Sequence, residues 1–295
     1  MKRRKFLKTA SVLTTMIGNM TELKGLEKLV DDMPLSEKMP LLFIGHGSPM
    51  NAIEDNEFTQ GMKQVAHTLS LPKAILCISA HWYIKGTKVT AMQQPKTIHD
   101  FHGFSQELYK QQYPASGHPE LANETRELLL PTQVGKDLDW GLDHGSWSVL
   151  KHLYPNADVP VFQLSIDATK GAEYHFKLAQ KLQSLRNKGV LIIGSGNIIH
   201  NLRLVDWPNF NKDNHGFDWA IEAREWVNKN IENRNFKSLY EYQKQGKAMQ
   251  LAVPTPDHYL PLIYTLGLAG VNEEIKLFND KLQAGSLSMT SLKIG

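Results

Sequence analysis

Three apolar runs in this chain end in small residues that lead to a histidine. The runs are LLFIG before His46, AILCIS before His81 and VLIIGSG before His200. Short runs of this composition are typical of strands that are buried on both faces of a parallel sheet. They therefore favour a fold with a central parallel sheet and predict that three imidazoles lie just beyond the ends of its strands.

The chain from Met39 onward alternates short apolar runs with longer amphipathic segments, the pattern of an α/β protein. We predict one domain over residues 39–295, with a largely parallel central sheet flanked by helices. The predicted strands span residues 41–44, 74–79, 88–91, 159–164, 190–195 and 274–278. The predicted helices span residues 57–69, 120–130, 146–153, 172–188, 218–229 and 237–242. The alternating segment SLSMTSLKI predicts one more strand, at an edge of the sheet.

Charge and composition exclude several classes of protein. Five of the 33 cationic residues lie within the first eight positions, so the rest of the chain carries 28 against 30 acidic residues. This balance leaves no basic stripe for a nucleic acid partner. No segment approaches the ~20 apolar residues of a membrane span, so we expect no stable membrane insertion. The single cysteine, Cys77, excludes an internal disulfide framework.

The N-terminal segment, residues 1–38, reads as a separate region. Its RRKFLK stretch resembles the twin-arginine signal of exported bacterial proteins. This resemblance predicts export to the periplasm of a protein that has already folded. The alternative is a disordered basic start to a cytoplasmic protein.

Five of the 12 histidines lie in contexts that favour a functional site. They are His46, His81, His144, His200 and His258. Ligands of open α/β sheets bind at the carboxyl ends of the strands, so we expect the imidazoles that follow strands to converge there. A group of neutral imidazoles binds a divalent ion such as zinc or iron and leaves positions open for chemistry. Five other histidines are predicted to be surface or capping residues: His67, His118, His152, His175 and His215.

Six motifs in order resemble one known family. They are GHGSPMN, SAHW, IHDF, DHGSW, SGNIIHNL and TPDHYLPL. Together they are similar to the 4,5-DOPA extradiol dioxygenase group of the class III extradiol enzymes, whose type member is the protocatechuate 4,5-dioxygenase B subunit. The resemblance extends from about Pro40 to the C-terminus. It implies a non-haem, metal-dependent enzyme that inserts both atoms of O2 into a catechol such as DOPA and gives a semialdehyde.

The resemblance also implies roles for the histidines. It assigns one divalent ion per chain to His46, His81, His200 and His258, and acid–base catalysis to His144. The wider class binds Fe(II) through two histidines and a carboxylate. Here a histidine matches the third position, while three carboxylates remain as alternatives: Glu54, Asp55 and Asp257. The resemblance implies Fe(II) for dioxygenase activity, with Zn(II) as another ion that such a site binds, and it makes no prediction of the oligomeric state.

Other residues are candidates for supporting roles. Ser195 and Asn197 are candidates either to orient a ligand histidine through its second nitrogen or simply to form the tight SGN turn. Aromatic residues near the motifs supply either a wall for the substrate ring or ordinary core packing: Trp82, Tyr83, Phe101, Phe104, Trp147 and Tyr259. Two other functions compete with the dioxygenase. One is a serine hydrolase using Ser48, Ser146 or Ser195, and the other is a zinc-dependent hydrolase or a metal-binding protein of the same fold without oxygenase activity.

Overall fold

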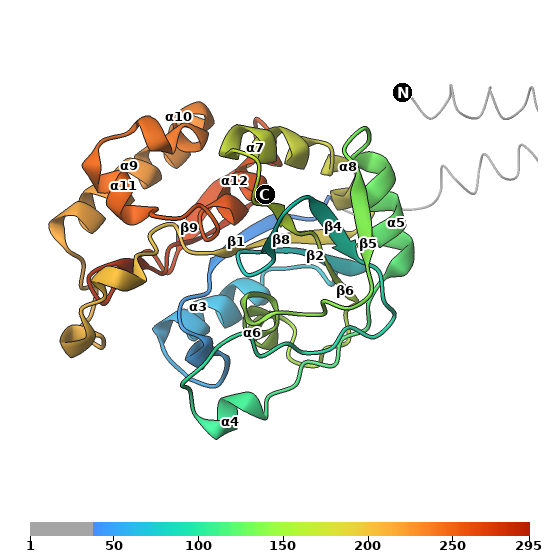
Figure 1. The fold of residues 1–295 in the computed structure, drawn as a ribbon, viewed down its shortest axis with the longest axis horizontal. Helices are drawn as coiled ribbons and strands as arrows, with labels where there is room; N and C mark the ends of the chain where they lie inside the picture. Colours follow the sequence, from blue (N-terminus) through green and yellow to red (C-terminus); the bar gives the residue numbers. More distant parts are fainter. Residues whose placement is uncertain (1–37) are drawn as a thin grey trace, which may run out of the picture. The chain divides into compact units, whose positions relative to one another are not determined.

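The central element is a six-stranded sheet, seen in a computed structural model that describes residues 38–295 (Figure 1). The predicted twin-arginine signal lies outside the described residues. The strands, in spatial order, are β6 (Val161–Gln163), β2 (Ala74–Ser79), β8 (Val190–Gly196), β1 (Leu41–Gly45), β12 (Ser291–Ile294) and β9 (Ile275–Phe278). The first four are mutually parallel, and β12 and β9 are antiparallel to their neighbours. The predicted α/β fold with a largely parallel sheet is confirmed.

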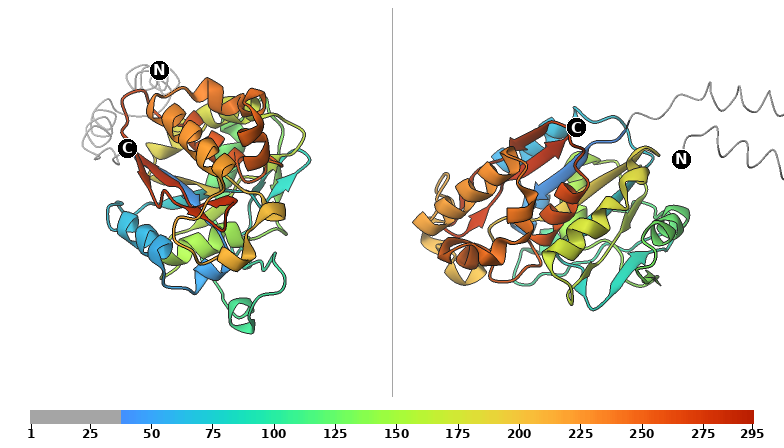
Figure 2. Two further views of the ribbon diagram at one scale, coloured as in Figure 1. Left: turned by 90° about the vertical axis from the view of Figure 1, so that its left-hand side faces the viewer. Right: turned by 90° about the horizontal axis from the view of Figure 1, so that it is seen from above.

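Helices cover both faces of this sheet (Figures 1 and 2). Packed on one face are α12 (Leu260–Gly267) and α7 (Ala172–Gln180), and on the other α6 (His144–Leu153) and α3 (Glu57–Ala66). Alternate residues of β1 pack on the two faces of the sheet, because successive side chains of a strand point to opposite faces. Leu41 and Phe43 join the apolar cluster with α12, whereas Leu42 and Ile44 join the cluster with α6.

Shorter elements surround this three-layer core. Three pairs of strands lie outside the sheet: β3 (Tyr83–Ile84) with β7 (Ile166–Asp167), β4 (Thr87–Thr90) with β5 (Val134–Asp137), and β10 (Leu282–Gln283) with β11 (Leu287–Ser288). The remaining α-helices are α4 (Gln106–Tyr109), α5 (Pro119–Leu128), α8 (Gln183–Arg186), α9 (Asp218–Glu232), α10 (Phe236–Tyr240) and α11 (Lys247–Ala252). Short 3-10 turns are η1 (Pro49–Ala52), η2 (Leu202–Leu204), η3 (Trp207–Asn209) and η4 (Tyr242–Lys244).

The predicted C-terminal strand forms, but it does not lie at an edge. Strand β12 pairs with β1 on one side and β9 on the other, so β9 is the edge strand. The alternation of SLSMTSLKI reflects two short strands, β11 and β12, whose residues are nearly all buried. Period-two alternation identifies a strand but does not tell how many neighbours it has.

Three further differences concern the other elements. The predicted strand at residues 88–91 forms as β4, yet it pairs with β5 outside the central sheet. The predicted helix at 172–188 is divided into α7 and α8. Helix α12 was not predicted. Every residue of its sequence LPLIYTLG is buried, and it is apolar all round, so its hydrophobicity shows no helical periodicity.

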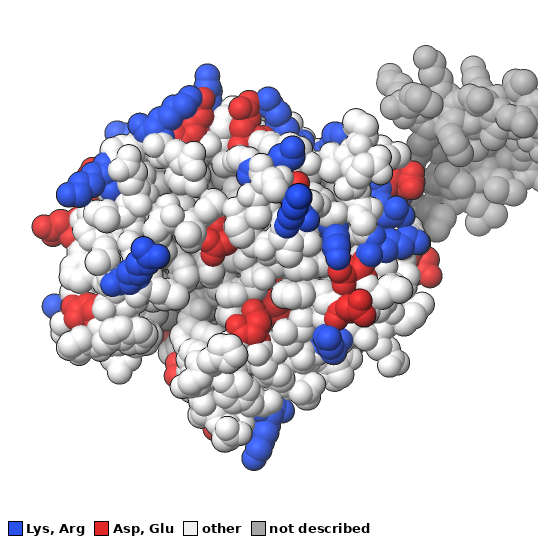
Figure 3. All heavy atoms as spheres, viewed as in Figure 1, with Lys and Arg blue, Asp and Glu red and all other residues white. Residues whose placement is uncertain are grey.

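Charged side chains of both signs are interspersed over the face shown in Figure 3. On this face the lysine and arginine side chains do not form a basic stripe. None of the helices within residues 38–295 combines the length and the apolar character that crossing a bilayer requires.

Candidate metal centre

Five imidazoles gather beyond the carboxyl ends of the three central parallel strands. His46 directly follows β1 and His81 lies two residues after β2, while His200 follows the end of β8. His144 begins α6, and His258 lies just before α12. Strands β2, β8 and β1 are neighbours, so the predicted convergence is confirmed. The ring centroids of His46 and His81 lie 5.1 Å apart, and those of His46 and His258 lie 5.3 Å apart.

Three of these histidines form one compact group of nitrogen atoms. His46, His81 and His258 each offer one nitrogen, and the three atoms lie within 4.8 Å of one another. Nε2 of His46 is 3.3 Å from Nε2 of His81. His200 belongs to a second group, with Asp257 and His258. Its ring stacks on that of His258 at a centroid distance of 3.6 Å and an interplanar angle of 10°.

Each member of the first group has its other nitrogen held by a polar partner. Nδ1 of His46 is 3.0 Å from Oγ of Ser195, which also donates to the carbonyl of Gly145. The Ser195 hydroxyl therefore accepts from His46 Nδ1–H, which leaves Nε2 unprotonated. Nδ1 of His81 is 3.2 Å from Oδ2 of Asp100.

The third member is held in the same way. Nδ1 of His258 hydrogen-bonds to the carboxylate of Asp257, which leaves Nε2 as its free nitrogen. A polar partner on the second nitrogen is the usual arrangement for histidines that bind metals, because it sets the tautomer and the direction of the lone pair. The donor set of three imidazoles, each with a partner, therefore fits a single divalent ion.

Burial keeps most of these imidazoles neutral. It lowers the pKa of His46 well below its usual range, and the neighbouring His81 lowers it further. Burial lowers the pKa of His200 to about 3 and also lowers the pKa of His258, where Asp257 opposes the shift. Burial likewise disfavours the charged form of His81, but the Asp100 carboxylate together with the negative charges of Asp143 and Asp257 outweighs it and raises the pKa. Neutral imidazoles carry the lone pairs that a metal requires.

His144 is placed beside this group by the start of α6. Asp143 caps the helix by accepting a hydrogen bond from the backbone N–H of Ser146 at 3.1 Å. The His144 ring lies 3.8 Å from that of His81, and its Nδ1 is 3.1 Å from Oδ1 of Asp100. Burial lowers the pKa of His144, while the nearby carboxylate of Asp100 raises it and partly compensates.

Asp100 links two of the site histidines, and the sequence analysis did not identify it. One carboxylate oxygen faces His81, and the other faces His144 and accepts from its backbone N–H at 2.9 Å. Burial would raise the pKa of Asp100, but the adjacent imidazoles of His144 and His81 together outweigh it and lower the pKa. The motif IHDF contained the signal, since its carboxylate lies between a histidine and a phenylalanine of the site region.

Ser195 and Asn197 both support the site, in different ways. Ser195 orients His46 through its second nitrogen, as predicted. Asn197 acts through its backbone instead, because its N–H donates to the carbonyl of His258 at 2.9 Å. Its side chain lines the pocket, and its buried Oδ1 has no hydrogen-bond partner among the described residues. Asn197 Oδ1 is therefore an acceptor that is available to a ligand.

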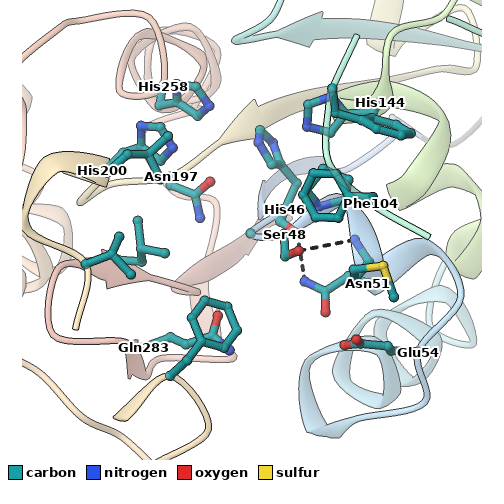
Figure 4. Close-up of a pocket in the computed structure, with 18 of the residues that line it drawn as sticks. His46, Ser48, Asn51, Glu54, Phe104, His144, Asn197, His200, His258 and Gln283 are labelled. Atoms are coloured by element: carbon teal, nitrogen blue, oxygen red, sulfur yellow. Dashed lines mark hydrogen bonds between the residues drawn. The ribbon is translucent and has the colours of Figure 1, made fainter. Parts of the chain in front are cut away.

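A cavity of about 580 Å³ opens in front of the histidines (Figure 4). Of the predicted aromatic residues, Phe101 and Phe104 line it. The other four do not: Trp82, Trp147 and Tyr259 are buried in the core and Tyr83 lies in β3. The opposite wall comes from a segment that the sequence analysis missed, and its residues include Leu202, Val205, Trp207 and Phe210. The signal in the sequence was the group of apolar residues in this loop, and in the fold Trp207 is 67% exposed.

The alternative carboxylates occupy different places. Asp257 supports His258, as described above. Asp55 forms an ion pair with Lys63 on the surface, with 2.7 Å between Oδ1 and Nζ. Glu54 lines the cavity on the side away from the histidines (Figure 4).

The histidines outside the site mostly lie where the sequence indicated. His67 is exposed, and His118 caps α5 by accepting from the N–H of Leu121. His215 pairs with Asp206, at 2.7 Å between Nε2 and Oδ2. The prediction is wrong for His175, which is fully buried between α7 and α12 and hydrogen-bonds to Tyr264. Helical spacing did not show that this side of α7 faces another helix.

The three serines considered as nucleophiles form other interactions. Ser146 is buried and hydrogen-bonds to Gln163, and Ser195 is buried and holds His46. Ser48 caps the turn η1 by accepting from the N–H of Met50. None of the three forms a serine–histidine–acid relay that opens into the cavity, so the structure does not support the serine hydrolase.

Comparisons with known proteins agree with this geometry. Residues 40–289 match the family described as the catalytic LigB subunit of aromatic ring-opening dioxygenase. A protein of Escherichia coli (strain K12) named 4,5-DOPA dioxygenase extradiol is 45% identical, over 90% of this chain and 99% of the relative. A Beta vulgaris protein of the same name is 36% identical, over 85% of this chain and 94% of the relative. The crystal structure of an uncharacterized Escherichia coli K12 protein matches with a TM-score of 0.74 at 43% identity, over 87% of this chain and 100% of that one.

Proposed function

The chain belongs to the family of catalytic LigB subunits of aromatic ring-opening dioxygenases, and from this premise we propose that it opens the ring of a catechol such as DOPA beside its two hydroxyl groups. Both atoms of O2 enter the product, a semialdehyde, so the reaction needs no external reductant. The observation that supports this proposal best is the group of three imidazole nitrogens at one end of a cavity that aromatic side chains help to line.

We propose that His46, His81 and His258 hold the metal ion and that His200, stacked on His258, is the fourth histidine of the centre. Fe(II) held by these residues would bind a catechol and O2 and would supply redox chemistry that Zn(II) lacks. The polar partners hold the other nitrogen of each ring, and one nitrogen from each of the three rings lies within 4.8 Å of the others. Phe101 and Phe104 face the same space and are placed to contact the substrate ring.

His144 is proposed as the acid–base group. Its Nδ1 faces Asp100, so Nε2 is the nitrogen that is free to accept a proton from a catechol hydroxyl. Burial favours the neutral imidazole before the transfer, and the Asp100 carboxylate stabilises the imidazolium after it. The same Nε2–H then donates its proton when the ring opens, so one residue serves both steps.

Oxygen uptake tests the proposed activity. Metal-free protein is loaded anaerobically with Fe(II), mixed with DOPA, protocatechuate or caffeate, and then exposed to O2. We expect oxygen uptake and a yellow product with at least one catechol, and neither with Zn(II)-loaded protein. Absence of uptake with every catechol would instead favour the zinc-dependent hydrolase or the metal-binding protein without oxygenase activity.

We also propose export to the periplasm through the twin-arginine-like segment RRKFLK. The double substitution Arg3→Lys with Arg4→Lys keeps the charge and removes the paired arginines. We expect the variant to stay in the cytoplasm, as measured by fractionation. Unchanged accumulation in the periplasm would refute the targeting proposal and favour the cytoplasmic alternative.

A further inference from the structure

The cavity has two chemically different ends. Figure 4 shows the histidines at one end and the side chains of Glu54 and Gln283 at the other. Under the proposed function, on which this inference rests, the two hydroxyl groups of the catechol face the histidines. A substituent para or meta to the hydroxyls then extends toward the other end. The residues there meet the part of the substrate that does not react.

Charge is distributed unevenly over the cavity wall. Among the described residues that line it, Glu54 carries the only carboxylate and none is lysine or arginine. The side chains by which this segment lines the cavity are apolar, so they offer a charged substituent no compensation: Leu202, Val205, Trp207 and Phe210. A substituent that carries only a carboxylate therefore meets one negative charge and no positive side chain. A substituent that carries an ammonium group meets an opposite charge.

Glu54 is held in place but has no cationic partner. Its backbone N–H donates to the carbonyl of Met50 at 3.0 Å, and its Oε2 accepts from Nδ2 of Asn56 at 3.3 Å. Within residues 38–295 it forms no ion pair, in contrast to its neighbour Asp55, which pairs with Lys63. Its negative charge is thus left uncompensated at the cavity.

We propose that Glu54 determines substrate specificity. It favours catechols whose substituent carries an ammonium group and disfavours those whose substituent carries only a carboxylate. The carboxylate attracts the ammonium group and repels an acidic substituent. Glu54 is exposed, so water screens this interaction and the expected discrimination is modest. Glu54 does not touch the reacting atoms, so it acts on binding rather than on turnover.

Three catechols that differ only in their substituents test this rule. Dopamine carries the ammonium group alone, DOPA carries both groups, and 3,4-dihydroxyphenylpropanoate carries the carboxylate alone. Dissociation constants are measured anaerobically on the Fe(II)-loaded protein, and KM and kcat are measured in air. We expect the wild-type protein to bind dopamine more tightly than the propanoate, with a smaller difference at about 0.5 M salt.

The variant Glu54→Gln removes the charge and keeps the size. We expect its dissociation constants for dopamine and DOPA to rise roughly threefold to fivefold, as for an exposed ion pair, and the constant for the propanoate to fall. The kcat values stay within about twofold of the wild type. The matched control Asp55→Asn removes the same charge from the next residue, which does not line the cavity, and leaves all three constants unchanged.

Two results would overturn the proposal. One is a Glu54→Gln variant that changes all three dissociation constants equally or not at all, and the other is an Asp55→Asn variant that reproduces its effect. Failure of the proposed function looks different, because then the wild-type protein consumes no oxygen with any catechol. The anaerobic dissociation constants still rank the three substituents in that case, so the role of Glu54 is tested independently of turnover.

Discussion

At the scale of single residues, the hydrogen-bond partner of each histidine decides which of its nitrogens is free. Ser195, Asp100 and Asp257 each hold one nitrogen of a site histidine. One nitrogen from each of His46, His81 and His258 consequently lies within 4.8 Å of the other two. Five histidines in a sequence do not form a metal site on their own, since a protonated or misdirected imidazole cannot bind an ion.

The first prediction separates metal binding from proton transfer. We expect His46→Ala or His81→Ala to lose the bound ion, because either change removes one of three converging nitrogens. His144→Ala is expected to keep the ion and to slow turnover roughly 10²- to 10⁴-fold, the usual contribution of an acid–base group. Metal analysis and oxygen uptake measure the two effects. Full metal content in the first two variants would contradict the assignment.

A second prediction concerns Asp100, the carboxylate shared by His81 and His144. Asp100→Asn keeps the size but removes the charge that supports both imidazoles. We expect metal affinity to fall roughly 10- to 100-fold, as for other partners of metal-binding histidines. Competition with a chelator measures the affinity, and Asp139→Asn, at an exposed position, is the control. An affinity equal to that of the wild type would show that Asp100 does not hold His81.

At the scale of elements, the site depends on how closely β8 and the segment before α12 approach each other. A Cβ atom added to Gly196, the last residue of β8, would lie 2.2 Å from the carbonyl oxygen of His258. That oxygen also accepts from the backbone N–H of Asn197. Only a residue without a side chain lets the two segments meet, and their meeting places His258 beside the ends of the strands.

A third prediction follows from this approach. We expect Gly196→Ala to displace His258, to destabilise the fold by about 1–3 kcal/mol and to lower metal content, because backbone atoms cannot give way as a flexible side chain does. Thermal unfolding and metal analysis measure these changes. Gly171→Ala is the control, since a Cβ there meets nothing within 4 Å. If Gly196→Ala behaved like this control, the close approach would not be needed.

At the scale of the whole molecule, two apolar layers enclose the sheet, and polar groups buried in them connect stability to pH. His175 is fully buried, with Nδ1 3.0 Å from the hydroxyl of Tyr264 in α12 and Nε2 3.2 Å from the carbonyl of Asp167. Burial lowers its pKa to about 4, although the hydrogen bond to Asp167 opposes the shift. The folded protein therefore keeps this imidazole neutral.

The fourth prediction is the resulting pH dependence of the free energy of unfolding. In the unfolded chain, His175 is protonated below its ordinary pKa of 6.5. In the folded protein, it is protonated only below about pH 4. Stability is therefore full above pH 6.5 and falls as the pH drops toward 4, by at most about 3 kcal/mol. Chemical denaturation across this range should show a smaller loss for His175→Gln. The control His67→Gln, at an exposed position, should follow the wild type.

The sequence by itself determined the strands of the central sheet, their largely parallel arrangement and the histidines that follow three of them. These features are local, because an apolar run long enough for a buried strand and the small residues that end it can be read from neighbouring positions. The motif order was sufficient for the family as well. His46, His81 and His200 therefore lie beyond adjacent strands, as predicted.

Only the tertiary structure decided how those residues combine. It placed His258 with His46 and His81 and set His200 beside them, and it brought Asp100 between two histidines. It also turned Glu54 toward the cavity and its neighbour Asp55 toward Lys63. The physical reason is that these arrangements depend on contacts between segments far apart in the chain. Hydrophobic periodicity reports whether a residue is buried, but not which distant side chain it meets.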